Sequence, residues 1–243
     1  MEIEMHYPAN ERLCLKNPEF SELGQRIVLK SIELINKLGI ENFTFKKLAK
    51  EIQSNEASIY RYFENKHNLL VYLMSIYWDI LNLKISFNTQ NLDNPKEKIM
   101  KVIDVLTNVG MAIPRVKNVD LKTLHEIVIS ESAKAYLTKN IENEIKEGFF
   151  NSYERIILTL SVIFREANPS YEFPKALAIN LLETTYEQIY FSQHLGSFTE
   201  LEGKSMSSNT VKRFLESIIY SVLELKDRSI DTDKRRKSTE KQR

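Results

Sequence analysis

Two short amphipathic patterns flank a polar turn in the segment TFKKLAKEIQSNEASIYRYF, which spans residues 44–63. The hydroxyl of Thr44 stands directly before the first pattern, where it can accept from free backbone amides, so a helix is predicted to begin there. Polar residues 53–55 interrupt the pattern, and Ile59 and Phe63, four residues apart, give a second, very short helix its apolar face. Two short helices around a tight polar turn predict a helix-turn-helix.

Helical periodicity continues on both sides of this segment. Before it, apolar residues recur at helical spacing from Gly24, and Gly39 lies where a left-handed C-terminal cap is expected. After it, Asn65 can cap a long helix from about residue 66 to about residue 87, and Asn94 followed by proline opens another. Further helical patterns cover about 119–139, 141–167, 174–194 and 209–225. No convincing period-two alternation is present, so the sequence predicts an all-α protein.

The composition is that of an ordinary globular protein, with 243 residues, 42% hydrophobic and 28% charged. Cys14 is the only cysteine, which excludes an internal disulfide and favours a reducing compartment. The N-terminus lacks a secretory signal, and the apolar stretch 156–164 is about half of the roughly 20 residues that span a bilayer. We therefore expect a cytoplasmic protein without membrane contact.

Residue patterns typical of catalytic sites are missing from the sequence. The six glycines are scattered, so they form no phosphate-binding loop, and no nucleophile elbow is found. The four histidines, His6, His67, His125 and His194, lack metal-ligand spacing. We expect no enzyme, no catalytic residue, no metal and no cofactor.

Charge is distributed unevenly along a chain whose formal net charge is +1. Residues 24–70 carry eight Lys and Arg against five Glu, whereas residues 1–23 carry two against five. This basic excess is mild and coincides with the helix-turn-helix, where phosphate contacts would be made.

Several short features occur in a fixed order between residues 24 and 70. They are Arg26-Ile27-Val28, Leu38-Gly39, Thr44-Phe45, Leu48-Ala49 and Ser58-Ile59-Tyr60-Arg61-Tyr62-Phe63, followed by Lys66 and Leu69-Leu70. Together they resemble the DNA-binding domain of tetracycline-repressor (TetR) type regulators over about a fifth of the chain, which is more specific than one short motif. Ile52-Gln53-Ser54-Asn55 departs from the family's usual Gly-Val-Ser turn, and Glu56 stands where a basic residue is common.

The resemblance implies that the second short helix enters the DNA major groove. The side chains expected at base edges are Asn55, Glu56, Ala57, Ser58 and Arg61. By similarity to the family, phosphate contacts are expected from Thr44, Tyr60, Tyr62 and Lys66, with Lys46 and Lys47 assisting. Core packing is the alternative role for the two tyrosines, and ordinary surface charge is the alternative for the lysines.

Beyond about residue 88 the resemblance is architectural, and it implies a helical domain that binds a ligand and dimerises. The residues expected to line a ligand pocket are His125, Tyr136, Phe149, Tyr153, Phe164, Tyr186 and Tyr190. The residues expected at a two-fold dimer interface are Leu177, Leu181, Ile189, Phe214, Ile218 and Val222. Packing within the chain's own core is the alternative for both sets.

The expected organisation has four parts: an N-terminal arm (1–23), a three-helix DNA-binding domain (24–65), a larger ligand-binding and dimerisation domain (66–226) and a charged, disordered tail (227–243). The tail's basic cluster, residues 234–237, either contacts DNA phosphate or stays solvated.

The expected function is that of a ligand-responsive repressor. It binds a pseudo-palindromic operator in double-stranded DNA as a homodimer and responds to a small, mostly apolar effector. The alternative is a helical scaffold that keeps the helix-turn-helix without ligand control.

Overall fold

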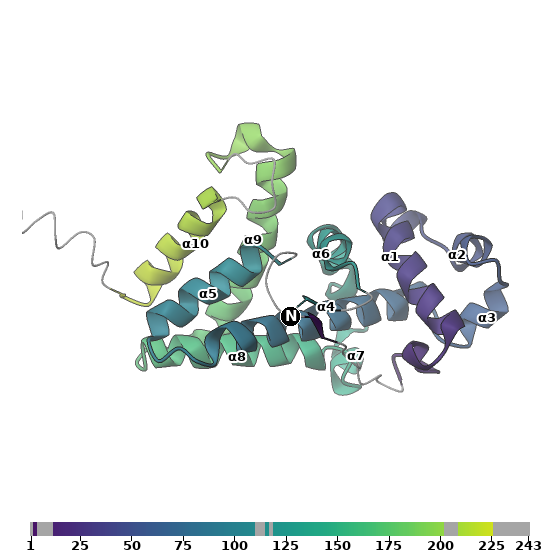
Figure 1. Ribbon diagram of the computed structural model, residues 1–243, viewed down its shortest axis with the longest axis horizontal. Helices are drawn as coiled ribbons and strands as arrows, with labels where there is room; N and C mark the ends of the chain where they lie inside the picture. Colours follow the sequence, from purple (N-terminus) through teal and green to yellow (C-terminus); the bar gives the residue numbers. More distant parts are fainter. Residues whose placement is uncertain (1, 4–11, 110–114, 117–118, 202–208, 226–243) are drawn as a thin grey trace, which may run out of the picture.

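The computed structural model of the chain describes residues 2–3, 12–109, 115–116, 119–201 and 209–225. Helices dominate these residues (Figure 1): α1 (Glu22–Asn42), α2 (Phe45–Glu51), α3 (Glu56–Tyr60), α4 (Lys66–Thr89), α5 (Pro95–Thr107), α6 (Leu121–Tyr136), α7 (Ile141–Lys146), α8 (Asn151–Ala167), α9 (Pro174–His194) and α10 (Asn209–Val222). Short 3-10 turns lie at η1 (Pro18–Phe20) and η2 (Gly196–Phe198). The predicted all-α class is confirmed.

One element of the fold was not predicted from the sequence. A two-residue strand β1 (Glu2–Ile3) pairs in parallel with β2 (Arg115–Val116). The pairing is confined to these four residues in the described part of the chain, so it adds a local link and leaves the helical architecture unchanged.

The helices α1, α2 and α3 form a small body at one end of the elongated molecule (Figure 1). Side-chain oxygens of polar residues start its helices: Ser21 accepts from the Gly24 amide, Thr44 from the Lys47 amide and Asn55 from the Ser58 amide. These caps satisfy amides that have no partner within the helix, which explains how helices as short as α2 and α3 persist. Gly39 takes a left-handed φ of 73° and kinks the end of α1, as its position predicts.

The long helix α4 leads from this small body into the larger one (Figure 1). Asn65 caps it as predicted, accepting from the Asn68 amide. In the larger body α4 packs against α5, α6 and α8, so side chains around much of its circumference are buried. Among the described residues α4 is the one helix long and apolar enough to cross a membrane, yet 72% of its apolar window is buried inside the protein. Core helices of this kind share that length and composition.

The single helix predicted over residues 141–167 is wrong, because the structure divides it into α7 and α8. Gly148 lies between them with a left-handed φ of 78°. Its amide donates to the Ile145 carbonyl, and the Phe149 amide donates to the Glu144 carbonyl. This is the glycine-terminated end of a helix, and it allows α8 to leave in a new direction.

The expected N-terminal arm is partly packed on the small body. Leu13 and Cys14 are buried, and the Leu15 amide donates to the Tyr62 carbonyl at 2.9 Å. Gly24 allows this packing, because a Cβ atom there would lie 2.2 Å from the Pro18 carbonyl oxygen. The predicted tail 227–243, with its basic cluster, lies outside the described residues.

Candidate nucleic-acid interface and effector cavity

The short helix α3 is anchored on one face and exposed on the other. Ile59 and Phe63 are fully buried, whereas Ala57 and Arg61 are exposed and the side chains of Glu56 and Ser58 are half-buried. Asn55 is also exposed, but its Oδ1 atom is engaged by the Ser58 amide at 2.8 Å and the Ser58 hydroxyl at 3.1 Å. Asn55 therefore has a structural role as the cap of α3.

The two tyrosines predicted to contact phosphate lie in different environments. Tyr60 is 49% exposed, and its ring packs edge-on against Phe45 at 5.0 Å between centroids. Tyr62 is only 3% exposed, and its hydroxyl is hydrogen-bonded to the Ser21 hydroxyl at 2.7 Å. For Tyr62 the expected phosphate contact is corrected: this side chain packs in the core beneath the N-terminal segment.

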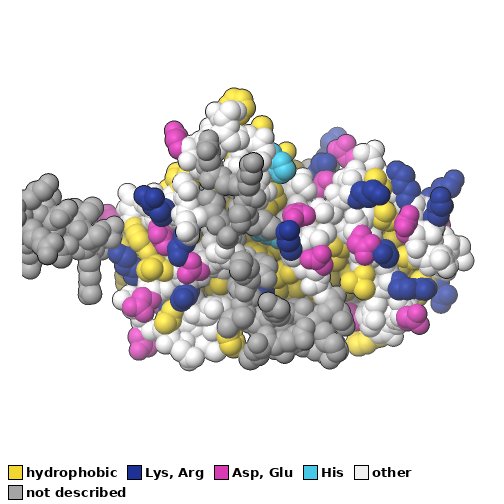
Figure 2. Space-filling model, turned by 45° about the horizontal axis from the view of Figure 1, so that its top comes forward, with side chains coloured by type: hydrophobic (Ala, Val, Ile, Leu, Met, Phe, Trp, Pro, Cys, Tyr) yellow, Lys and Arg dark blue, Asp and Glu magenta, His cyan; other side chains and the backbone are white. Residues whose placement is uncertain are grey.

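Basic side chains surround the helix-turn-helix end of the molecule (Figure 2). Lys46 and Thr44 are exposed, and Lys47 is exposed with its ammonium donating to the Asn42 carbonyl at 2.6 Å. The ammonium of Lys66 donates to the carbonyls of Ile40 and Glu41 at 2.8 and 3.0 Å. Lys66 therefore satisfies carbonyl groups at the kinked end of α1, a role that the sequence did not reveal.

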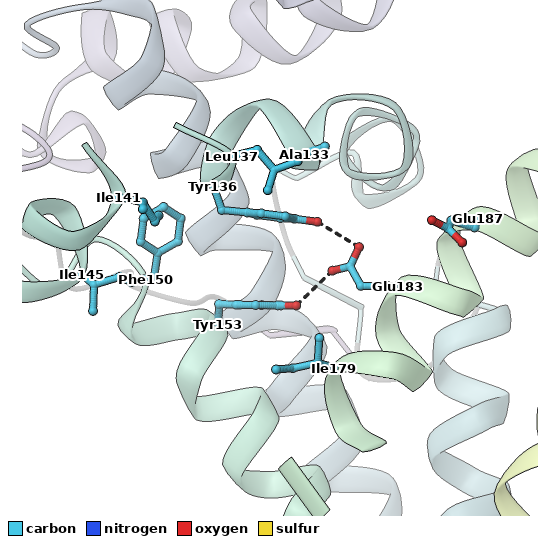
Figure 3. A pocket seen from close by; sticks show the side chains of 10 residues that line it. All are labelled: Ala133, Tyr136, Leu137, Ile141, Ile145, Phe150, Tyr153, Ile179, Glu183 and Glu187. Atoms are coloured by element: carbon cyan, nitrogen blue, oxygen red, sulfur yellow. Dashed lines mark hydrogen bonds between the residues drawn. The ribbon is translucent and has the colours of Figure 1, made fainter. Parts of the chain in front are cut away.

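A cavity of about 540 Å³ opens among α6, α7, α8 and α9 in the larger body (Figure 3). It is lined by Ala133, Tyr136, Leu137, Ile141, Ile145, Phe150, Tyr153, Ile179, Glu183 and Glu187. Its size falls in the range of about 300–1,000 Å³ typical of small-molecule sites. Of the seven predicted pocket residues, Tyr136 and Tyr153 line this cavity.

The other five predicted pocket residues do not line it. His125, Phe149, Phe164 and Tyr186 are buried in the core, as helical spacing of large apolar side chains usually produces. Tyr190 is 40% exposed and packs against His194, outside the cavity. These five residues therefore lie outside this cavity.

A buried aromatic cluster lies directly behind the cavity wall. The Tyr77 hydroxyl lies 2.7 Å from His125 Nδ1 and 3.4 Å from the Tyr186 hydroxyl. Burial lowers the pKa of His125 to about 4, so its ring is neutral at pH 7. Trp78 joins this cluster to the cavity, because its ring centroid lies 4.8 Å from that of Tyr153. The Tyr153 side chain therefore lies between Trp78 and a ligand bound in the cavity.

Glu183 is one of the cavity-lining residues that were not predicted from the sequence. Its carboxylate accepts from the Tyr136 hydroxyl at 2.9 Å and from the Tyr153 hydroxyl at 3.0 Å (Figure 3). Burial is the main cause that raises the pKa of Tyr136 to about 12, so this phenol remains a neutral donor. In the sequence Glu183 and Glu187 lie four residues apart in a helix that also carries other polar residues, so the pair resembles a solvated helix face.

The residues predicted at a dimer interface also divide into two groups. Leu177, Leu181 and Ile189 are buried by the chain's own helices, so for them the interface prediction is corrected to core packing. Phe214 and Ile218 are half-buried and Val222 is exposed, while Val211, Leu215 and Ile219 on the same helix are fully covered. The helix α10 therefore has an apolar outer face in addition to its core face.

Helix α6 also contacts the small body directly, which the sequence did not predict. The buried carboxylate of Glu131 accepts from the Ile40 amide at 3.2 Å and forms an ion pair with Lys134 at 3.0 Å. Lys134 in turn pairs with Glu41 at 3.1 Å. Because α6 also carries Tyr136, the same helix lines the cavity and contacts the end of α1.

The arrangement of an exposed, anchored α3 after a tight turn is that of a helix-turn-helix. Residues 27–73 match the family model described as "Bacterial regulatory proteins, tetR family". Residues 27–73 of the chain therefore form a DNA-binding domain of the tetR regulator family. Within the described ranges no group of three or more His, Cys, Asp and Glu side chains is placed to hold a metal ion.

Solved structures resemble the chain over most of its length. GusR of Salmonella enterica is 15% identical, with a TM-score of 0.55 over 85% of this chain and 99% of that chain. The TetR family regulator PfmR of Thermus thermophilus is 12% identical, with a TM-score of 0.53 over 83% and 100%. AibR in complex with isovaleryl coenzyme A and operator DNA is 15% identical, with a TM-score of 0.53 over 79% and 97%. At these identities the likeness shows a shared fold, and no curated protein matches the chain.

Proposed function

We propose that the chain is a repressor that binds a pseudo-palindromic operator as a homodimer and releases it when a small effector occupies the cavity. The observation that carries this proposal is the geometry of α3, whose apolar face is fixed by Ile59 and Phe63 while Ala57 and Arg61 project to solvent. Such a helix can enter the major groove without unfolding its own domain.

Each contact of the proposed interface follows from side-chain chemistry. Arg61 can donate two hydrogen bonds to guanine, Ala57 can contact a thymine methyl, and Glu56 can accept from a cytosine amino group. Thr44, Tyr60, Lys46 and Lys47 are exposed around α3 and are proposed to contact phosphate. The half-buried Ser58 hydroxyl donates to Asn55 and can still accept a hydrogen bond from DNA, whereas Asn55 and Lys66 act by holding α3 and the end of α1 in place.

The homodimer is proposed because α3 has only five residues and reads few base pairs by itself. Two-fold symmetry doubles the contacts over half-sites about 34 Å apart. The interface we propose uses the outer face of α10, with Phe214, Ile218 and Val222, and the exposed aromatic residues Tyr190 and Phe191 of α9. The domains proposed are a DNA-binding domain at 24–65 and a ligand-binding and dimerisation domain at 66–226.

In the proposed switch, two helices connect the cavity with the DNA-binding domain. The helix α6 lines the cavity through Tyr136 and holds the Ile40 amide through Glu131. The helix α4 is the covalent link, and its Trp78 packs on the cavity residue Tyr153. An effector that moves either helix changes the separation of the two α3 helices, and a shift of a few ångströms weakens the fit to one half-site. A tenfold loss of affinity needs about 1.4 kcal/mol of coupling.

Selection of bound fragments from the source genome tests the proposal. We expect a small set of fragments that share an inverted repeat, retained at salt concentrations that abolish random binding. Arg61→Ala should lose this selectivity, and Lys175→Ala, which removes an exposed charge at the start of α9, should keep it. Weak, sequence-independent binding by the unmodified protein would favour the helical scaffold without ligand control.

A regulator that binds chromosomal DNA must be in the same compartment as the chromosome, so we propose a cytoplasmic location.

A further inference from the structure

The ionisable groups of the cavity are all acids. Among its ten lining residues the ionisable groups are the carboxyls of Glu183 and Glu187 and the phenols of Tyr136 and Tyr153, and no lining residue is basic. In the described part of the chain neither carboxylate forms an ion pair with a Lys, Arg or His side chain. Within the described residues, the cavity therefore presents two carboxyl groups that have no basic partner.

The carboxylate of Glu183 is held in a fixed orientation. One oxygen accepts from Tyr136 and the other from Tyr153, while the two rings stack in parallel, with centroids 6.2 Å apart and planes inclined by 7° (Figure 3). An ionised carboxylate offers about four lone-pair positions, so two phenols leave acceptor capacity for a ligand.

Glu187 adds a second negative group one turn farther along α9. Residues four apart lie on the same helix face, and like charges at this spacing repel each other. Both carboxylates line the same cavity, so a cation between them removes this repulsion. An anionic ligand would experience the repulsion of both groups.

The remaining walls suit an apolar body. Ala133, Ile141 and Phe150 line the cavity, and its edge is formed by Leu137, Ile145 and Ile179, which are 79%, 57% and 42% exposed. Large apolar side chains left in solvent around a concave site gain stability when a ligand covers them. The faces of the tyrosine rings also attract cations.

We propose that the effector of this cavity is a lipophilic organic cation, an amine or a quaternary ammonium compound with an apolar or aromatic body, recognised by Glu183, Glu187, Tyr136 and Tyr153. This inference rests on the proposed function for its regulatory consequence, because it names the class of effector that the switch detects. It adds a positive charge to the mostly apolar ligand that the sequence predicts.

Three probes that share a phenylbutyl body and differ in the charge of the head group test the proposal. They are phenylbutyltrimethylammonium, its neutral tert-butyl analogue and phenylpentanoate, titrated into the full chain with calorimetry and Trp78 fluorescence as readouts. The cation should bind at least about tenfold more tightly than the neutral analogue, and the anion should bind most weakly. Trp78 emission should change on binding, because Trp78 packs against Tyr153.

Variants that remove charge without changing shape complete the experiment. Glu187→Gln, at an exposed position, and Glu183→Gln should each lower affinity for the cation by about tenfold while changing affinity for the neutral analogue less than about twofold. The matched control Glu172→Gln removes an exposed charge before the first turn of α9 and should leave both affinities unchanged. If Glu183→Gln unfolds the protein, Glu187→Gln and Tyr153→Phe still decide the outcome.

The outcomes separate this inference from the proposed function. Three results would overturn the proposal of a cationic effector: equal affinity for the cation and the neutral analogue, tighter binding of the anion, or no binding of any probe. Absence of binding is the result expected if a second copy of the chain fills the cavity. The affinity of the protein for operator DNA can be measured in the absence of all three probes. If the cation binds through Glu183 and Glu187 without changing operator affinity, the site is supported and the proposed switch fails.

Discussion

Removal of the Glu131 side chain should loosen the contact between the small body and α6. Glu131 is only 6% exposed, and its carboxylate accepts from the Ile40 amide at 3.2 Å. In Glu131→Ala this amide loses its acceptor at a buried position, which costs about 1–3 kcal/mol. For a chain of this size 1 kcal/mol corresponds to about 2–4 °C in Tm, so a loss of about 2 kcal/mol lowers Tm by about 4–8 °C.

Glu131→Gln separates the hydrogen bond from the charge. The amide oxygen of glutamine can still accept from Ile40, and only the ion pair with Lys134 is removed. The Lys134 side chain is 44% exposed, so this pair contributes at most about 1 kcal/mol. Glu126→Ala, on the same helix, is the control, because it removes an exposed hydrogen bond to Asn36 and should change the free energy of unfolding by less than about 0.5 kcal/mol.

Urea unfolding followed by circular dichroism, together with thermal melts, measures these differences. The expected order of stability is unmodified protein, then Glu131→Gln, then Glu131→Ala. An effector that lowers operator affinity through α6 should also lose part of its effect in Glu131→Ala. Equal losses in the two Glu131 variants, or a change in Glu131→Ala no larger than that of the control, would refute the reasoning.

Three further predictions follow from single side chains. Arg61→Ala should lower affinity for the selected operator by about 1–3 kcal/mol and relax its specificity, whereas Lys46→Ala should weaken binding to all sequences and reduce the salt slope by about one for the phosphate that is no longer neutralised, as measured by fluorescence anisotropy. Burial lowers the pKa of His125 from 6.5 to about 4, so between these pH values the unfolded chain binds a proton that the folded chain does not bind. The free energy of unfolding should therefore be unaffected by this group above pH 6.5 and should fall by about 3 kcal/mol as the pH drops to 4. A His125→Gln variant that keeps the same pH dependence of stability would contradict this assignment. Burial raises the pKa of Cys14 to about 12, so iodoacetamide should modify this thiol only after unfolding, and rapid modification of the folded protein would contradict its burial.

The helix-turn-helix was predictable because its signals are local. Thr44 and Asn65 cap helices within three residues of their own positions, and Gly39 adopts the left-handed conformation that its place in the pattern requires. Ile59 and Phe63 lie on one face because they are one helical turn apart. Each of these features depends on a few neighbouring residues.

The roles of Tyr62 and Lys66 were not predictable in the same way. Tyr60 and Tyr62 are two residues apart, and both are aromatic residues of a very short helical pattern. Tyr62 is buried because Ser21 and the preceding segment fold over it. Lys66 binds carbonyls that lie about 25 residues earlier in the chain. Such contacts come from tertiary packing, which periodicity does not encode.

The cavity shows the same limit. Aromatic residues at helical spacing identify the interior of the larger body but do not separate the wall of a cavity from solid core, so His125 and Tyr186 were grouped with Tyr136 and Tyr153. Glu183 carries no local signal in the sequence that separates it from an ordinary charged residue on a helix surface. The meeting of Glu183 with both tyrosines depends on the packing of three helices, α6, α8 and α9.

The stoichiometry and symmetry of the complex with selected operator DNA test the central claim most directly. Sedimentation of the protein on a fragment recovered from the source genome, combined with hydroxyl-radical footprinting, gives both quantities in one preparation. We predict two chains bound to an inverted repeat, protecting half-sites about one DNA turn apart and contacting them equally. One chain on an asymmetric site, or binding that covers every fragment alike, would contradict the account of this chain as a dimeric, sequence-reading regulator.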